Sequence, residues 1–134
     1  MRGLVVLGLV GFALTASCTL QAGTGPVTSL RVAFWEGPGD EPDVVWTLRC
    51  NPAGGTLPRP ARACAKLARS GGKLFAPPRR DLVCTQIYGG PQRARVVGRI
   101  AGERVWASFS RTDGCQIGRW NALSPWLLPP GGVT

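Results

Sequence analysis

Hydrophobic and polar side chains alternate in several short segments of this chain, which is the period-two pattern of a strand with one buried face. The clearest pair is residues 93–100 and 104–109, where arginines separate apolar side chains and an Ala-Gly turn joins the two segments. We expect these segments to form an antiparallel hairpin. The same alternation predicts two earlier strands, at residues 30–34 and 44–49.

Helical spacing of apolar residues occurs in two further segments. Residues 61–70 follow a proline suited to a first helical turn, and they place Cys64, Leu67 and Ala68 at helical spacing. A Gly-Gly pair follows and can end this helix. A second short helix is expected at residues 117–123. Together these segments predict an α+β domain, with an antiparallel sheet of four to five strands and one or two short helices packed on one face.

The length of 134 residues bounds the chain to one domain. Its first residues carry one arginine and then an apolar run that is too short to span a bilayer, so residues 1–17 are predicted to be a removed export signal. We expect a flexible tether at residues 18–28 and the folded domain at residues 29–128. Residues 129–134 have nothing to bury and are expected to be a frayed tail.

The end of the export signal, Leu14-Thr15-Ala16-Ser17-Cys18, resembles a bacterial lipobox, in which the cysteine is lipidated and becomes the new N-terminus. The chain has five cysteines, and an odd exported cysteine is otherwise a reactive liability. This favours lipidation of Cys18, with that lipid as the only contact with a membrane. The alternative is ordinary cleavage nearby. In both cases we expect a secreted or cell-surface bacterial protein.

The chain is strongly basic, with 16 Lys+Arg, 7 Asp+Glu and a net charge of +9. Such a surface can attract nucleic acid, anionic lipid or a cell-wall polymer. The arginines are spaced singly and no aromatic–basic stacking platform is evident, so we expect no nucleic-acid partner. A basic cell-surface lipoprotein that binds an anionic polymer remains an open function class. Its binding face would carry Arg93, Arg95, Arg99 and Arg104.

Histidine is absent, which removes the usual general base, the Ser-His-Asp and Cys-His systems and the commonest metal ligand. The other cysteines contain no C-x-x-C pair, and an exported chain favours oxidation, so zinc is not expected. Four cysteines allow three disulfide pairings. We therefore expect a protein that is not an enzyme and has no cofactor or metal. The four cysteines are Cys50, Cys64, Cys84 and Cys115.

Seven short motifs follow one another between residues 44 and 121. They are Thr47-Leu48-Arg49-Cys50, Ala63-Cys64-Ala65-Lys66-Leu67, Gly71-Gly72-Lys73-Leu74, Asp81-Leu82-Val83-Cys84, Tyr88, residues 96–102 and residues 109–115. This series resembles the Streptomyces subtilisin inhibitor family, which consists of small secreted inhibitors of serine proteases. The resemblance implies the disulfides Cys50–Cys64 and Cys84–Cys115. It also implies a subtilisin-like serine protease as the partner, inhibited reversibly and in the manner of a substrate.

The family's reactive bond lies two residues after the third conserved cysteine. Carried over to this chain, the resemblance implies Gln86-Ile87 as the reactive bond. The other protease-contact residues are then Val83, Cys84, Thr85 and Tyr88. Gln86 departs from the Met, Leu or Lys that relatives commonly have. Asp113 stands where many relatives have Asn, a residue implied to brace the loop by hydrogen bonding.

Two alternatives to inhibition remain open. In the first, residues 81–91 are an ordinary connecting loop whose inhibitory use has lapsed. In the second, the protein is the polymer-binding module and has no inhibitory activity. Trp106 alternates out of phase with its inward neighbours, which places it on the outer face of the sheet. Family members pair through a sheet face, so the resemblance implies a possible homodimer in which Trp106 and Val97 supply the contact.

Overall fold

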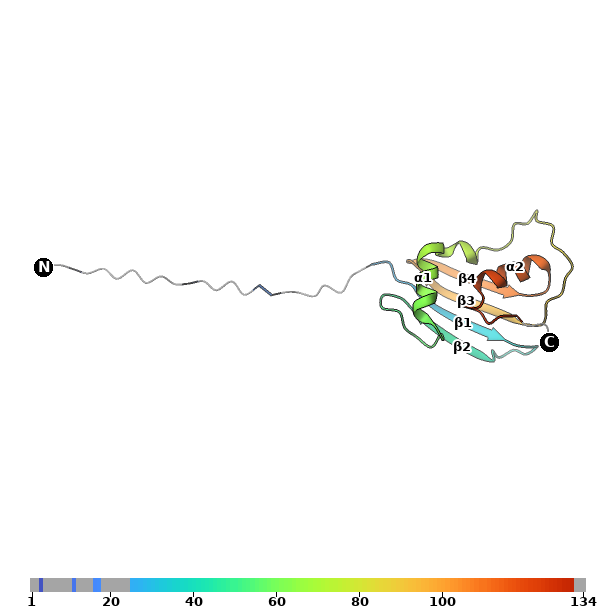
Figure 1. The fold of residues 1–134 in the computed structure, drawn as a ribbon, viewed down its shortest axis with the longest axis horizontal. Coiled ribbons are helices and arrows are strands. Elements are labelled where there is room, and N and C mark those ends of the chain that lie inside the picture. The colour runs from blue at the N-terminus through green and yellow to red at the C-terminus, as the bar shows by residue number, and fades with distance from the viewer. Residues whose placement is uncertain (1–2, 4–10, 12–15, 18–24, 132–134) are drawn as a thin grey trace.

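The structure is a computed structural model that describes residues 25–131 together with Gly3, Gly11, Ala16 and Ser17. Four strands form one antiparallel sheet in the order β2-β1-β3-β4, and both helices lie over the same face of that sheet (Figure 1). This confirms the expected α+β class. In chain order the elements are β1 (Ser29–Trp35), β2 (Val44–Arg49), α1 (Pro60–Ser70), the 3-10 helix η1 (Gly71–Phe75), β3 (Arg93–Ile100), β4 (Glu103–Ser110) and α2 (Gly114–Leu123).

The core lies between the sheet and the helices, and the period-two pattern places its strand residues as expected. Burial alternates along β1, β3 and β4, except that Ala33 is also buried and Gly98 is exposed. The buried strand residues include Leu30, Val32, Phe34, Ala94, Val96, Ile100, Val105, Ala107 and Phe109. From the helices, Leu67 of α1 and Trp120 and Leu123 of α2 pack into the same cluster.

Both helices differ slightly from the sequence expectation. The buried residues of α1 are Ala63 and Leu67, and Cys64 is partly buried against the same core, whereas Ala68 is exposed. Residues four apart share a helix face, and Ala63 is the position that lies one turn before Leu67. α2 begins at Gly114, three residues earlier than expected, because the Asp113 side chain caps its first turn.

Two disulfides connect these elements in the pairing that the resemblance implied. Cys50–Cys64 joins the end of β2 to α1, with the two Cα atoms 5.6 Å apart. Cys84–Cys115 joins the segment before β3 to α2, with the two Cα atoms 5.3 Å apart. Each disulfide therefore fixes one helix to a distant part of the chain.

The first and last segments of the domain are hydrogen-bonded to its strands and helices. The Thr28 carbonyl accepts from the Cys50 N–H (3.1 Å), and the Pro129 carbonyl accepts from the Trp120 indole (2.9 Å). Most of the expected export signal, Cys18 and residues 132–134 lie outside the described residues. Neither helix in the described part of the chain combines the length and the apolar character that crossing a membrane requires.

Candidate functional site

A long loop with exposed apolar side chains connects η1 to β3. Residues 76–92 contain no helix or strand, and in Figure 1 they arch outward beside α2. Val83 is 94% exposed, and Leu82, Ile87 and Tyr88 are each more than half exposed. Large apolar side chains concentrated on one exposed segment are typical of a surface that binds a partner.

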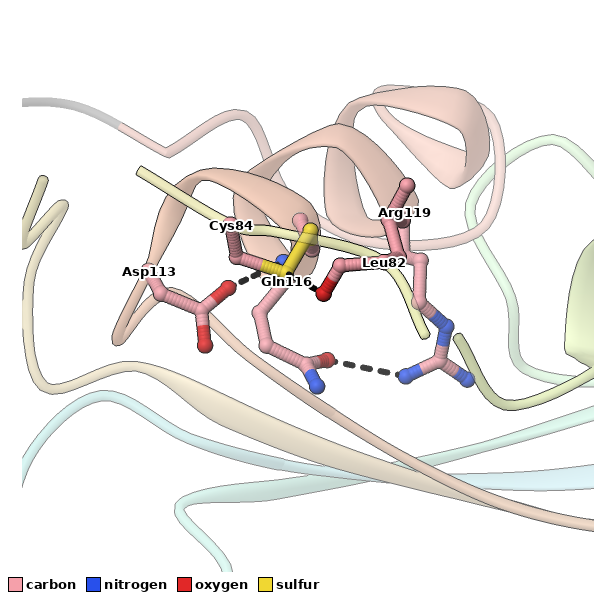
Figure 2. The surroundings of a disulfide bond; sticks show 6 residues. Leu82, Cys84, Asp113, Gln116 and Arg119 are labelled. Atoms are coloured by element: carbon pink, nitrogen blue, oxygen red, sulfur yellow. Dashed lines mark hydrogen bonds between the residues drawn. A yellow bond between two sulfur atoms is a disulfide. The ribbon is translucent and has the colours of Figure 1, made fainter. Parts of the chain in front are cut away.

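The amino-terminal half of the loop is fixed to α2 at two consecutive residues. Cys84 is joined to Cys115 by the disulfide, and Leu82 lies close to the same sulfur (Figure 2). One residue further on, the Thr85 carbonyl accepts a hydrogen bond of 2.9 Å from the Gly114 N–H. A Cβ on Gly114 would overlap the Thr85 hydroxyl, so this close approach requires glycine.

The carboxyl-terminal half of the loop is fixed to the segment between β4 and α2. The Gly89 N–H donates to the Arg111 carbonyl at 2.7 Å. Gly89 is buried, and a Cβ there would lie 2.9 Å from Ile117 Cδ1, closer than van der Waals contact allows. Gly90 has a φ of 134°, in the region that favours glycine. The loop therefore approaches the domain at its two glycines.

Arg111 lies beneath this glycine turn and is 5% exposed. Its Nη1 donates to Gln92 Oε1 at 3.1 Å and its Nη2 donates to the Gly131 carbonyl at 3.4 Å, whereas its Nε has no partner in the described residues. An arginine buried to this degree is unusual and is normally paired. Its guanidinium links the end of the loop to the C-terminal segment.

Gln86, Ile87 and Tyr88 lie between these two anchors. Within residues 25–131, the backbone hydrogen bonds that join the loop to α2 and to the segment before it fall on Thr85 and Gly89, and no backbone hydrogen bond involves the three residues between them. Their peptide groups are therefore free to bind a partner, while the chain on both sides is held in place. The structure brings the expected contact residues Val83, Cys84, Thr85 and Tyr88 into one exposed segment around Gln86-Ile87.

Asp113 supports this arrangement through α2. Its Oδ1 accepts a hydrogen bond from the Gln116 N–H at 2.9 Å, which makes Asp113 the N-cap of the helix (Figure 2). No hydrogen bond joins its side chain to the loop in the described residues, which differs from the direct bracing that the resemblance implied. The extended backbone of Asp113 directs its carboxylate toward α2. The cap thereby fixes Gly114 and Cys115, which do contact the loop.

The next turn of α2 is packed on the sheet by Arg119. Its Nη1 donates to Gln116 Oε1 at 2.9 Å and to the Ser108 carbonyl at 3.1 Å, and its guanidinium lies 4.5 Å from the centre of the Phe109 ring. Desolvation by burial lowers the pKa of the Arg119 guanidinium, which stays charged. The helix that holds the loop is thus itself held by the sheet.

The disulfide region has a composition that resembles a metal site. The sulfur atoms of Cys84 and Cys115 and a carboxylate oxygen of Asp113 lie within 4.8 Å of one another. The two sulfur atoms are bonded to each other, and a disulfide does not supply the thiolate that a metal ligand requires. This cluster is therefore a structural brace.

Sequence reasoning identified the turn at Gly89 but did not identify Arg111 and Gly114 as parts of the site. Gly114 could have been found from its position next to Cys115. A disulfide between a helix and a loop brings the two backbones close together, and a glycine beside the cysteine allows that approach. Arg111 carries no such signal, because a single arginine among many is normally read as solvated.

A family model described as subtilisin inhibitor-like matches residues 27–112, which is more than half of the chain and includes the whole loop. The chain belongs to the subtilisin inhibitor-like family. Subtilisin inhibitor-like protein 1 of Streptomyces cacaoi is 36% identical to it over 80 residues, which cover 57% of this chain and 72% of that relative. Members of this family are protease inhibitors and not enzymes, as the missing histidines predicted.

A solved structure of a subtilisin inhibitor-like protein has a similar fold. It is Streptomyces caespitosus sermetstatin in complex with Bacillus licheniformis subtilisin, with a TM-score of 0.53 and 25% sequence identity. The similarity covers 78% of this chain and 99% of sermetstatin. The family relation and the two disulfides together indicate an extracellular protein.

Proposed function

We propose that this chain inhibits a subtilisin-like serine protease by presenting residues 83–88 as a substrate-like segment with Gln86-Ile87 as the reactive bond. One observation carries the proposal: this bond lies in the exposed segment between two anchors, the Gly114–Thr85 and the Gly89–Arg111 hydrogen bonds. The similarity to an inhibitor that is bound to subtilisin supports the class of protease.

The mechanism follows from how the loop is held. An extended peptide can bind beside a protease strand through main-chain hydrogen bonds, while alternate side chains fill pockets. Because the loop is already ordered by the Cys84–Cys115 bridge and its two anchors, little conformational entropy is lost on binding. If the protease cleaves the bond, both new ends stay in place and religation remains easy. Inhibition thus requires no reactive group on this protein.

The side chain of Gln86 sets the preference among proteases. Glutamine buries less apolar surface in the primary specificity pocket than leucine does, and a buried methylene contributes about 0.8 kcal/mol. Gln86→Leu should therefore tighten inhibition of subtilisin by roughly threefold to tenfold. Gln86→Lys should shift the preference toward trypsin, whose pocket carries a carboxylate.

Inhibition constants of the parent and the two variants against subtilisin and trypsin test this proposal. Equal constants for all three proteins would show that Gln86 does not enter the pocket. A parent protein that leaves subtilisin fully active would show that the loop is an ordinary connection. The polymer-binding alternative predicts instead a steep loss of binding with salt and no effect of Gln86.

We also propose that residues 1–17 direct export and that a lipid on Cys18 attaches the protein to the cell surface. The lipobox-like segment and the odd number of cysteines support this. Cys18→Ala should release the protein from the membrane into the medium, whereas a parent that is already in the medium would contradict it.

A homodimer through Trp106, which is 74% exposed and lies opposite Val97, stays a prediction that sedimentation velocity tests.

A further inference from the structure

The two halves of the loop are held to the domain by different kinds of contact. The covalent bridge Cys84–Cys115 holds the half that precedes the bond Gln86-Ile87. Within the described residues, the half that follows this bond is fixed to the domain by one backbone hydrogen bond, from the Gly89 N–H to the Arg111 carbonyl. The second half is therefore the one that depends on side chains for its support.

The Arg111 side chain supplies such support beneath the glycine turn. Its Nη2 would lie 3.3 Å from a Cβ on Gly89, and its Nη1 would lie 3.1 Å from a Cβ on Gly90. The guanidinium thus fills the space under both glycines. The same Nη1 donates to Gln92 Oε1, so one side chain packs against the whole end of the loop.

The C-terminal segment holds Arg111 from the other side. The Arg111 Nη2 donates to the Gly131 carbonyl at 3.4 Å, and a Cβ on Gly131 would overlap the guanidinium. The segment reaches this point from the end of α2, and the hydrogen bond from the Trp120 indole to the Pro129 carbonyl fixes it on the way. Arg111 is therefore enclosed between the glycine turn and the C-terminal segment.

No ion pair explains why this arginine is buried. Among the described residues Arg111 lies within ion-pair distance of no carboxylate, although it is only 5% exposed. Gln92 connects it to a carboxylate indirectly, because the Gln92 Nε2 donates to Glu36 Oε1 at 3.3 Å. Burying a charge without a direct partner costs folding free energy, and proteins accept such costs mainly at functional sites.

We propose that Arg111 is a positioning residue that keeps the second half of the loop in place after a protease has opened the reactive bond. This inference rests on the proposed function. When the protease serine attacks the Gln86 carbonyl, a serine ester of Gln86 forms and the peptide bond breaks. The Ile87 nitrogen leaves as an amine that carries the proton of the serine. If this amine attacks the ester, the peptide bond is restored and the serine recovers its proton.

Hydrolysis competes with this religation. If the amine moves away, water attacks the ester, Gln86 is left with a carboxylate and the chain stays nicked. The disulfide retains the ester half in either case, whereas retention of the amine at Ile87 depends on the anchor two residues further on, at Gly89. A reactant that is held in place reacts far faster than one that diffuses. Arg111 thereby favours religation over hydrolysis.

Two variants loosen Arg111 without changing the segment that meets the protease. Arg111→Met keeps an unbranched side chain and removes the hydrogen bonds to Gln92 and Gly131. Gly131→Ala retains Arg111 but displaces its guanidinium, because the new Cβ would overlap it. The matched control is Ile100→Ala, which removes a buried side chain at the end of β3 that lies farthest from the loop. Urea unfolding checks that the control loses at least as much stability.

The equilibrium between nicked and intact protein measures how well the amine is retained. Each protein is incubated with a catalytic amount of subtilisin, starting once from the intact form and once from the nicked form, at a temperature where all variants are folded. The nicked-to-intact ratio should rise by about tenfold in Arg111→Met and by at least about threefold in Gly131→Ala, since hydrogen bonds that order the amine half are lost. Ile100→Ala should stay within about twofold of the parent.

Amide hydrogen exchange of the free proteins measures the anchor without a protease. Arg111→Met should speed exchange of the Gly89 N–H by about tenfold and leave the Gly114 N–H, which reports the other anchor, nearly unchanged. An unchanged Gly89 amide would overturn the inference, as would a ratio that stays at the parent value in both test variants or moves equally in Ile100→Ala. A parent that leaves subtilisin fully active would overturn the proposed function and, with it, the role of Arg111 in religation.

Discussion

The two disulfides join segments of very different character. Cys50–Cys64 connects a strand to a helix, and both sulfur-bearing residues pack against the hydrophobic core. Cys84–Cys115 connects α2 to an irregular loop, beside Val83, which is almost fully exposed. The first bridge lies where the domain is already held by packing. The second lies in an irregular loop that is otherwise anchored by the Gly114–Thr85 and Gly89–Arg111 hydrogen bonds.

A comparison of chain entropy alone would miss this difference. The bridges close segments with sequence separations of 14 and 31 residues, for which the loop-closure model gives about 3.0 and about 3.7 kcal/mol. The two stabilising effects are therefore nearly equal. What separates the bridges is the structure that each one holds, so we expect them to differ in function much more than in stability.

The largest expected effect comes from opening each bridge in turn. Replacing Cys84 and Cys115 by Ser should raise the inhibition constant for subtilisin by about 100-fold or more, because the loop must then be ordered by the protease. Replacing Cys50 and Cys64 by Ser should leave the constant nearly unchanged for the folded protein. Both changes should lower the free energy of unfolding by roughly 3–4 kcal/mol.

Urea unfolding and inhibition assays at a temperature where both variants are folded would measure this contrast. Equal losses of inhibition would show that the loop is held by general stability of the domain, and not by its own bridge.

A smaller effect is expected where α2 touches the loop. In Gly114→Ala the new Cβ overlaps the Thr85 hydroxyl and forces Thr85 away, so the inhibition constant should rise by about tenfold, or about 1.4 kcal/mol. Gly118→Ala is a matched control on the same helix, because its Cβ meets no atom within 4 Å. The control should gain about 0.5–1 kcal/mol of stability and inhibit like the parent. Inhibition constants that are the same for both variants would contradict the proposed brace.

The smallest effect is expected at the helix cap. Asp113→Ala removes the hydrogen bond to the Gln116 N–H and should cost about 1 kcal/mol of stability, with a rise of a few-fold in the inhibition constant. Asp113→Asn should be close to neutral in both measurements, since asparagine caps helices as well as aspartate does. Thermal unfolding and inhibition assays would decide, and a large loss in Asp113→Asn would show that the negative charge itself is required.

The sheet and the helices could be predicted from the sequence because their patterns are local. Alternation in residues 93–100 and 104–109 identified the hairpin, and Trp106 was correctly placed on the outer face. The disulfide pairing came from the family resemblance, since four cysteines alone allow three pairings. Local patterns were weaker for α1, where Leu67 was placed in the core but the buried Ala63 was not identified among the several alanines of the helix.

The contacts that hold the loop could not be predicted because they join distant parts of the chain. The Gly89–Arg111 and Gly114–Thr85 hydrogen bonds involve backbone groups, and the two glycines do not indicate which distant residue each one approaches. The arginines on the outer face of the sheet show the same limit. The hairpin alone predicted four of them, whereas Arg31 and Arg49 join this face only through the register of β1 and β2.

The most direct test of the account is the position of the bond that a protease cleaves in this protein. After long incubation with a catalytic amount of subtilisin at mildly acid pH, mass spectrometry of the unreduced and reduced protein should show a single nick. The account predicts a new N-terminus at Ile87, with the two fragments held together by Cys84–Cys115 until reduction. A nick at another bond, or progressive digestion of the loop, would contradict it.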